Sequence, residues 1–525
     1  MANRPLDHSF MRERMRPLVY AASAATGVVS GLVIVAYRAA IHALEAARAG
    51  AIDAAKAGPA AAGAGALGLA AAGVLGAAAL GYLVYRMTKA APHIKGSGIP
   101  QVKAALMRRI EPLWRRELPL KFAGGSLALG AGLSLGREGP SIQLGALIGQ
   151  GLAELSGRPE LRRYLITAGA AAGISAAFNA PLAGVLFCVE ELHRNVSPAM
   201  LLGALISSFA ANAVMWAFQG HEPVFGLAID AVLPLSSYGT GVLAIGLAAG
   251  LVGVLFSRGL LAAQRAYAAA APSAGVRMAS AFAVAAVVAV AAPALAGGGE
   301  ALIESVAAGG AALGPLALLL AGKLAFTLFC YASGAPGGIF LPMLTVGALL
   351  GAAANGLGGS GAAYLDNYML LGMVGLFAAV VRAPVTGAVL ITEMAGSFAH
   401  FPSFIFVSII ASLVAGALRT EPIYDSLLER IAPDHPAASG SRPTVLYVPI
   451  QEGSVLDSCP GTQRILPEGC ILAAVEHGDK ELFPAPELDL QPGDVIKVIV
   501  PEARAYELKE RLLALGEAEE RPAEG

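Results

Sequence analysis

A pair of charged residues inside a long apolar region most constrains how this chain can fold. Arg137 and Glu138 lie in the stretch Gly136-Arg137-Glu138-Gly139-Pro140, between the apolar runs LALGAGLSL and SIQLGALIGQ. Charged side chains at membrane depth are costly and are usually kept for a function. Glycine frees the backbone and proline suits the first turn of a helix. The stretch therefore predicts a helix that begins inside the membrane, with Glu138 at its N-terminal end.

The N-terminal end of such a helix is a site for an anion. Its first N–H groups have no acceptor within the helix, and the helix dipole is positive there. Glu138 is itself an anion, so its carboxylate can occupy this site when no other anion does. The alternative is that Arg137 and Glu138 pair with each other at the helix end. The stretch by itself leaves both interpretations open.

The composition sets the class of protein. Of the 525 residues, 56% are hydrophobic and only 14% are charged, which is typical of an all-α polytopic membrane protein in contact with lipid. A net charge of -1 gives no reason to expect a nucleic-acid partner. The basic residues ahead of the first apolar segment place the N-terminus in the cytoplasm: Arg4, Arg12, Arg14 and Arg16.

Catalytic and metal chemistry have no visible basis in the sequence. The four cysteines (Cys188, Cys330, Cys459 and Cys470) show neither a disulfide framework nor metal-ligand spacing. No set of nucleophile and base appears either. We therefore expect no cofactor, no metal and no enzymatic activity.

The apolar segments are numerous, and several are short or cut by glycine and proline. Broken helices are tolerated in a membrane only where protein buries them or where they line a cavity. After a cytoplasmic N-terminal segment at 1–17, we expect a first span at 18–44 and then a charged, alanine-rich connector at 45–58. The loop at 219–238 carries His221, Glu222 and Asp230 and should be external. The later apolar segments are expected at 59–85, 119–135, 141–153, 164–189, 199–218, 239–269, 277–297, 311–331, 343–357, 368–392 and 402–418.

An internal repeat relates the two halves of the apolar region. The run LKFAGGSLALGAGLSLGREGPSIQLGALIG aligns with GKLAFTLFCYASGAPGGIFLPMLTVGALLG, which places Lys121 opposite Lys323 and Pro140 opposite Pro342. Farther on, NAPLAG aligns with RAPVTG, and Glu190 falls opposite Glu393. A duplicated unit with broken helices in equivalent places indicates a transporter or channel whose site lies between the repeats. The sequence pattern alone leaves parallel and inverted halves equally possible.

Three short motifs and a tyrosine resemble the CLC family of chloride channels and chloride/proton exchangers. GSGIP at 96–100, GREGP at 136–140 and GGIFLP at 337–342 occur in the family's order, and Tyr424 falls at the place of its pore tyrosine. The resemblance covers roughly residues 12–432. It implies two inverted repeats of tilted, broken helices, at about 18–218 and 239–432. It also implies a homodimer in the cell (inner) membrane with one pore per subunit, which carries chloride and, in exchangers, protons.

The resemblance assigns the anion site to loops at helix N-termini. The hydroxyls of Ser97 and Tyr424 resemble the two side-chain donors of the central anion. The backbone N–H groups of Ile339 and Phe340 complete that site, and Gly136, Arg137 and Gly139 belong to the loop around it. A hydroxyl discriminates against cations without a full charge that would trap the anion. The alternatives are an N-cap role for Ser97 and a lipid-interface role for Tyr424.

Two glutamates resemble the proton-carrying residues of the family. Glu138 resembles the gating glutamate, whose carboxylate occupies the outer anion site until it is protonated. Glu191 resembles the internal glutamate that passes protons between the cytoplasm and Glu138. The alternative for Glu191 is a solvated helix end with His193 and Arg194 as local partners. Glu393 should have a structural role.

The composition changes after residue 432. Residues 433–443 (APDHPAASGSR) read as a linker, and the tail at 517–525 should be disordered. Between them, Thr444–Gln451, Ile471–Glu476 and Val495–Val500 alternate like strands, and Ala503–Leu515 has helical periodicity. The run 466–499 resembles the TrkA C-terminal domain of potassium-transport regulators. The resemblance implies that residues 444–516 form a small cytoplasmic α+β domain, which either regulates through a small ligand or only stabilises a dimer.

Three functions remain after the sequence analysis. The first is exchange of chloride for protons, which Glu191 favours because family channels usually lack this acid. The second is a passive chloride channel gated by Glu138. The third is a sensor built on an inactive pore, which the complete set of Ser97, Glu138 and Tyr424 disfavours.

Overall fold

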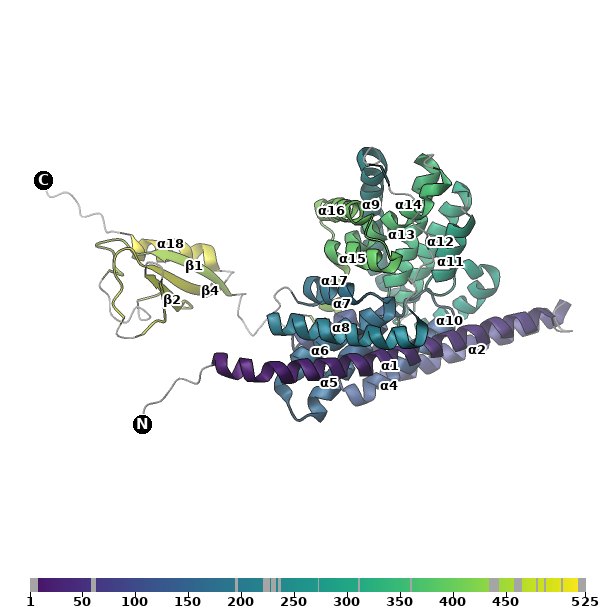
Figure 1. Cartoon of the computed structure of the whole chain (residues 1–525), viewed down its shortest axis with the longest axis horizontal. Coiled ribbons are helices and arrows are strands. Elements are labelled where there is room, and N and C mark those ends of the chain that lie inside the picture. The colour runs from purple at the N-terminus through teal and green to yellow at the C-terminus, as the bar shows by residue number, and fades with distance from the viewer. Residues whose placement is uncertain are drawn as a thin grey trace. The chain divides into compact units, whose positions relative to one another are not determined.

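The computed structural model describes most of the chain and separates it into two compact units, Met1–Ala432 and Pro433–Gly525 (Figure 1). The described residues are 8–57, 63–193, 197–220, 227, 233–234, 238–271, 273–309, 312–358, 361–433, 443–457, 465–477, 480–485, 488–501 and 504–517. The expected external loop with His221, Glu222 and Asp230, most of the linker and nearly all of the tail lie outside these residues.

The first half of the larger unit runs from α1 to α8. Its helices are α1 (His8–Ala57), α2 (Gly63–Ala90), η1 (Pro92–Ile94), α3 (Ile99–Leu106), α4 (Trp114–Gly130), α5 (Glu138–Leu155), η2 (Pro159–Leu161), α6 (Arg162–Phe178), α7 (Pro181–Phe187), the π-helical turn η3 (Cys188–Leu192) and α8 (Pro198–Gln219).

The second half runs from η5 to α17. Its helices are the π-helical turn η5 (Tyr238–Val242), α9 (Leu243–Ala270), α10 (Ala274–Ala291), η6 (Pro293–Leu295), α11 (Glu300–Gly309), α12 (Leu313–Ala332), α13 (Phe340–Gly358), η7 (Ala362–Tyr364), α14 (Leu365–Val381), α15 (Pro384–Ala395), α16 (Phe401–Ala417) and α17 (Ile423–Ile431). In Figure 1 most helices of each half gather together, but α10 packs beside α2 and α17 packs against α3 of the first half.

Seven helices in the described part of the chain are long and apolar enough to cross a membrane. They are the α1 segment Pro17–Ala57, the α2 segment Leu67–Ala90, and α8, α9, α10, α12 and α13. Helices α14, α15 and α16 are apolar but shorter. The mixture of long and short apolar helices is the polytopic, all-α architecture that the sequence predicts.

The helix that holds the first expected span extends beyond that span at both ends. Helix α1 is one continuous helix of 50 residues, so it includes residues 8–17 of the expected N-terminal segment and residues 45–57 of the expected connector. Alanine has the highest helix propensity, and the charged residues spaced between the alanines are also good helix formers. The charge pattern therefore did not mark the end of the helix.

Two expected single segments, 164–189 and 368–392, each consist of two helices. The chain turns at Asn179 and Arg382, whose φ angles of 54° and 67° lie in the left-handed region. Two residues farther on, Pro181 and Pro384 begin α7 and α15. Proline is suited to the first helical position, so the NAP and RAP sequences explain both breaks.

Pairs of equivalent contacts make the internal repeat visible in space. Lys121 on α4 donates to the carbonyls of Ile94 and Gly96, at 2.9 and 2.8 Å. Lys323 on α12 donates to the carbonyls of Leu295 and Gly297, at 3.0 and 2.6 Å. Each lysine thus fixes the loop that precedes a short helix, α3 in one half and α11 in the other.

The loop before α11 was not recognised in the sequence as the partner of the GSGIP loop. Gly96 and Gly98 have φ angles of 63° and 101°, and Gly297 and Gly299 have 66° and 108°. The backbone is therefore repeated at this point. The side chain is not, because Gly298 stands where the first half has Ser97.

Glu190 and Glu393 connect the halves reciprocally. The Glu190 carboxylate accepts the N–H groups of Val385 and Thr386 at the N-terminus of α15. The Glu393 carboxylate accepts those of Leu182 and Ala183 at the N-terminus of α7. Exchanged contacts of this kind indicate an approximate two-fold axis between the halves. An acidic group at the positive end of a helix is also favourable.

The smaller unit is an α+β domain. An antiparallel sheet of order β1-β4-β2-β3 is formed by β1 (Pro443–Pro449), β2 (Ile471–His477), β3 (Lys480–Leu482) and β4 (Val495–Pro501), and α18 (Ala505–Gly516) packs against β1. Val448, Val475 and Val498 from the sheet and Leu508 and Leu512 from α18 are buried in its core. The three expected strands and the helix are present, and β3 is additional.

Removal of the exchanged glutamate contacts should weaken the larger unit. Glu190→Ala and Glu393→Ala each leave two N–H groups at a helix start without their acceptor, at an expected cost of about 1–2 kcal/mol each. The measurement is thermal unfolding of the purified protein in detergent. Asp53→Ala, at an exposed position on α1, is the matched control and should leave the unfolding temperature unchanged. Equal unfolding temperatures for all three variants would contradict the capping role.

Candidate functional site

The three glycine-rich motifs meet at one place in the larger unit. Gly136 and Gly338 exchange two backbone hydrogen bonds, both at 2.7 Å, which join the second motif to the third. The N–H of Gly337 donates to the carbonyl of Gly96 at 3.1 Å, which joins the third motif to the first. Residues up to 241 positions apart in the chain are therefore held in contact by backbone hydrogen bonds.

Helix N-termini converge on this meeting point. Helix α3 begins at Ile99, α5 at Glu138 and α13 at Phe340, each within one of the motifs. The first N–H groups of a helix have no acceptor within it and carry partial positive charge. The convergence makes a region of positive potential in an apolar surrounding, which favours an anion.

Glu138 points its carboxylate into this region. Its side chain is fully buried, and within the described residues neither carboxylate oxygen has a hydrogen bond of ordinary geometry. One of its oxygens lies beside the backbone N–H of Leu341 in the first turn of α13, over Gly136. The carboxylate thus stands at the N-terminus of α13, where a second anion would also be favoured.

Arg137 and Glu138 do not form the ion pair that the sequence left open. The Arg137 guanidinium turns to Glu300, the first residue of α11, with N–O distances of 3.2 and 3.3 Å. Glu300 was not recognised in the sequence, because its part in the repeat was not seen. The pair leaves the Glu138 carboxylate without a bound cation.

Ser97 and Tyr424 supply two hydroxyl groups to the same region. Both side chains are buried, at 1% and 0% exposure, and neither hydroxyl has an ordinary hydrogen-bond partner among the described residues. They are close enough to each other to interact. Full burial argues against a lipid-interface role for Tyr424. The helix-capping alternative for Ser97 fails as well, since Gly98 is the N-cap of α3 and no side chain caps it.

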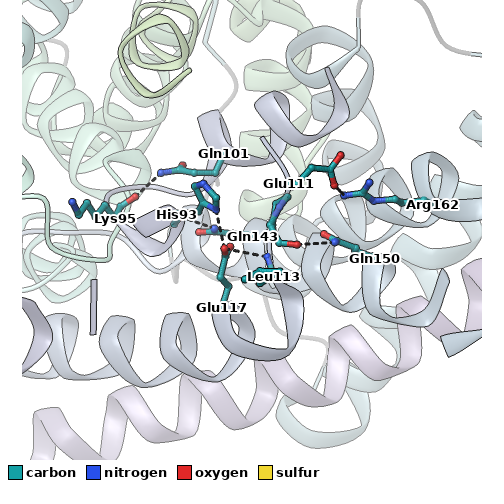
Figure 2. Close-up of polar contacts among 10 residues, drawn as sticks. His93, Lys95, Gln101, Glu111, Leu113, Glu117, Gln143, Gln150 and Arg162 are labelled. Carbon is teal, nitrogen blue, oxygen red and sulfur yellow. Dashed lines mark hydrogen bonds and ion pairs between the residues drawn. The ribbon is translucent and has the colours of Figure 1, made fainter. Parts of the chain in front are cut away.

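Four consecutive carbonyl groups before Ser97 are bound by other parts of the protein. The carbonyl of His93 accepts from Gln143 at 2.8 Å, and that of Lys95 accepts from Gln101 at 2.6 Å (Figure 2). Lys121 binds the two remaining carbonyl groups, those of Ile94 and Gly96. A carbonyl oxygen directed at an anion would repel it. With these oxygens occupied, the loop presents Ser97 and the α3 N-terminus to the site.

A buried carboxylate supports the same loop from outside. Glu117 on α4 accepts from the backbone N–H of Leu113 at 3.2 Å, and its Oε1 lies 2.8 Å from Nδ1 of His93, as Figure 2 shows. His93 belongs to η1, at the start of the loop. The contact ties the start of the loop to the beginning of α4.

Gly139 fits tightly against Ser97. A Cβ at position 139 would meet the Ser97 hydroxyl and carbonyl at distances that real atoms do not share. Glycine is therefore required here for close approach of the first two motifs.

Ile339 and Phe340 lie at the start of α13, as the resemblance implies. The Phe340 ring packs against Phe178 and Phe377, with centroids 4.9 and 4.8 Å apart. The ring thus fixes the N-terminus of α13 against α6 and α14, while the backbone N–H groups of this turn face the meeting point of the motifs.

Glu191 belongs to a largely buried ionic group near Tyr424. Its Oε1 accepts from Nζ of Lys103 on α3 at 2.9 Å, and the same ammonium binds the carboxylate of Asp425 on α17 at 2.5 Å. The alternative of a solvated helix end does not hold, since Glu191 is only 6% exposed, and His193 contacts Thr167 at 2.7 Å. Arg194 lies outside the described residues. The sequence analysis singled out neither Lys103 nor Asp425.

A cavity of about 340 Å³ lies beyond the C-terminal end of α3. Three arginines and two glutamates line it, together with apolar residues: Arg108, Arg162, Arg163, Glu111 and Glu160. The excess of positive charge favours the entry of anions. Glu111 and Arg162 form an ion pair at 2.6 Å (Figure 2). The neighbouring guanidinium holds the pKa of Glu111 below its ordinary value.

Metal chemistry finds no support in the described part of the chain, where no group of three or more His, Cys, Asp or Glu side chains is placed to hold an ion. The arrangement is suited to an anion instead: convergent N–H groups and two hydroxyls. One carboxylate can compete with the anion for the same place.

Comparisons with known proteins agree with this geometry. A family model described as "Voltage gated chloride channel" matches residues 76–416. The H(+)/Cl(-) exchange transporter ClcA of Cronobacter sakazakii is 39% identical over 368 residues, and the match covers 66% of this chain and 76% of that protein. The protein of the same name from Vibrio parahaemolyticus is 36% identical over 375 residues, with the same coverage.

The solved structures show the same fold. A slow cyanobacterial Cl⁻/H⁺ antiporter superimposes with a TM-score of 0.73 at 30% identity, and the match covers 79% of this chain and 98% of that one. A CLC-type fluoride/proton antiporter, at 23% identity and a TM-score of 0.64, supports the fold alone. On the matched family model and the extent of the identity to curated relatives, this chain belongs to the CLC family.

Proposed function

We propose that this chain is a secondary active transporter that exchanges chloride for protons across the cell membrane. The observation that carries the proposal is the buried Glu138 carboxylate beside the Leu341 N–H at the positive end of α13, together with the buried hydroxyls of Ser97 and Tyr424. The curated relatives named above are H(+)/Cl(-) exchange transporters, and the structural neighbour at 30% identity is a Cl⁻/H⁺ antiporter.

The proposed mechanism rests on competition between the Glu138 carboxylate and chloride for the N-terminus of α13. As an anion, Glu138 occupies the positive end of α13 and excludes chloride from it. A proton removes the charge of the carboxylate, so its attraction to the N–H groups falls and chloride can take the place. Ser97, Tyr424 and the N–H groups of Ile339 and Phe340 hold the chloride, with Gly136, Arg137 and Gly139 shaping the outer loop. Glu191, which like Glu138 lies close enough to Tyr424 to affect it electrostatically, exchanges protons between the cytoplasm and Glu138 in this proposal.

A passive channel gated by Glu138 is the second candidate. In a channel, as in an exchanger, the Glu138 carboxylate would compete with chloride at the N-terminus of α13. This competition needs no second acid. The buried Glu191, held by Lys103, is a further acid that gating alone does not require. Exchange therefore accounts for more of the structure.

Several features of the assembly belong to the same proposal. We propose a homodimer with one pore per subunit, embedded in the lipid of the inner (plasma) membrane, with both termini in the cytoplasm. We further propose that residues 444–516 form a TrkA-C-like module that regulates transport through a small ligand or stabilises the dimer. The antiparallel sheet with one packed helix is compatible with such a module.

Removal of either proton acid should separate the two fluxes. In liposomes with a chloride gradient, the unaltered protein should move protons uphill as chloride runs down. Glu138→Gln and Glu191→Gln should still pass chloride but move no protons, because the amide cannot carry a proton in the cycle. External chloride and pH are recorded together. Chloride movement without proton movement in the unaltered protein would instead establish a channel.

The close fit between the first two motifs should be needed for anion binding. Gly139→Ala pushes against the Ser97 hydroxyl. We expect chloride affinity, measured by titration calorimetry, to fall by about tenfold, which corresponds to about 1.4 kcal/mol. Gly76→Ala in α2, where an added Cβ meets no atom within 4 Å, is the matched control. An unchanged chloride affinity in Gly139→Ala would contradict the assignment of Ser97 to the anion site.

The C-terminal module should leave the coupling itself untouched. A chain that ends at Pro433 should keep the ratio of protons to chloride, because the two proton acids and the anion donors all lie in the first unit. It should differ in turnover rate or in the fraction of dimer, which flux assays and size-exclusion chromatography with light scattering report. A changed ratio would contradict a purely regulatory or dimerising role.

A further inference from the structure

The proton route needs an entry point that the proposed function does not supply. Glu191 is almost fully enclosed, with 5% of its side chain exposed, so it has little direct contact with water. A proton from the cytoplasm must therefore pass through another group or along bound water before it reaches Glu191. The described neighbours of Glu191 include one carboxylate suited to this step.

Asp425 is that carboxylate. Its side chain is 29% exposed, compared with 10% for Lys103 and 5% for Glu191. Exposure thus decreases in order from Asp425 through Lys103 to Glu191. The two carboxylates bind the same ammonium group, at 2.5 and 2.9 Å, so one lysine holds them within its reach.

We propose that Asp425 is the acid that takes up protons for Glu191, and that Lys103 is the positioning residue that holds the two together. The inference rests on the proposed exchange of chloride for protons. It adds one proton-accepting and one positioning residue to the two acids already assigned.

The transfer is balanced in charge. In the loaded state Asp425 carries the proton and Glu191 is an anion. When the O–H bond of Asp425 breaks and one forms on Glu191, the negative charge moves to Asp425, and Lys103 remains an ammonium throughout. In both states the buried ammonium has one negative partner, so no net charge is left in the protein interior.

The other charged groups near the trio are engaged elsewhere. Arg109, which follows α3, pairs with Glu429 on α17 at 2.8 Å. Glu421 accepts from Ser426 at 3.1 Å, and His193 contacts Thr167. Glu190, adjacent to Glu191 in sequence, caps α15. Lys103 contacts both carboxylates.

The position of Asp425 also connects the proton route to the anion route. Asp425 directly follows Tyr424 in the first turn of α17. Lys103 lies on α3, the helix whose N-terminus follows Ser97. The ionic group thus joins the two helices that present the anion-binding hydroxyls.

The test uses the full-length protein in liposomes, with chloride and proton fluxes recorded together. Asp425→Asn removes the acid but keeps its size, and we expect proton flux to fall by about 100-fold or more, since a positioned proton-transfer group usually contributes about 10²–10⁴-fold. Chloride flux should remain close to that of the unaltered protein. Asp425→Glu should restore proton flux, since it restores the acid. Lys103→Gln, which can still donate a hydrogen bond but carries no charge, should lower the ratio of protons to chloride.

Arg109→Gln and Glu429→Gln are matched controls. They break an ion pair that also joins the α3 region to α17, but one without Glu191. Both should keep the flux ratio. If Asp425→Asn keeps the ratio as well, or if the controls lower it equally, the entry role of Asp425 is wrong. If Glu191→Gln itself still moves protons, the assignment of Glu191 fails independently of Asp425.

Discussion

The structure depends on the convergence of positive helix ends in an apolar interior. Free N–H groups at the starts of α3, α5 and α13 would be costly in lipid unless an acceptor met them. The Glu138 carboxylate is one such acceptor, and an anion is another. The motif loops are fixed by backbone bonds between Gly136 and Gly338 and between Gly337 and Gly96. Exchange of the acceptor therefore does not require the scaffold to unfold.

The two halves share this scaffold but differ in chemistry. Lys121 and Lys323 bind carbonyl groups in equivalent loops, and both loops have the same pair of left-handed glycines. Only the first half places a hydroxyl there, on Ser97, while the second half has Gly298. In the second half, Glu300 at the start of the equivalent helix binds Arg137 instead. One half thus offers an anion donor and the other neutralises a cation, so a duplicated fold carries a single asymmetric site.

Much of the fold could be predicted from the sequence, because glycine and proline mark where membrane helices break. The motifs, the pairing of Lys121 with Lys323 and the start of a helix at Glu138 were all visible in the residues. The continuation of α1 through residues 45–57 was not, since its charged residues were taken as a sign of a loop although they favour a helix. The equivalence of Ser97 and Gly298 was hidden as well, because the repeat there is carried by backbone angles.

The site could be predicted only in part. Ser97 and Glu138 lie in recognisable motifs, and Tyr424 stands at a recognisable place after them. The ionic group of Lys103, Glu191 and Asp425 brings together residues up to 322 positions apart, and no local pattern marks such a contact. The four carbonyl groups bound around the Ser97 loop are equally invisible, since Gln101 and Gln143 have no distinctive spacing.

The most direct test of the account is whether chloride binding takes up protons. Chloride is titrated into weakly buffered protein while pH is recorded, in the unaltered chain and in Glu138→Gln. If chloride displaces the Glu138 carboxylate, the displaced group becomes easier to protonate, and by linkage binding must be accompanied by proton uptake. The account predicts uptake in the unaltered protein and markedly less in the variant. Chloride binding without proton uptake in the unaltered protein would contradict competition between the carboxylate and the anion.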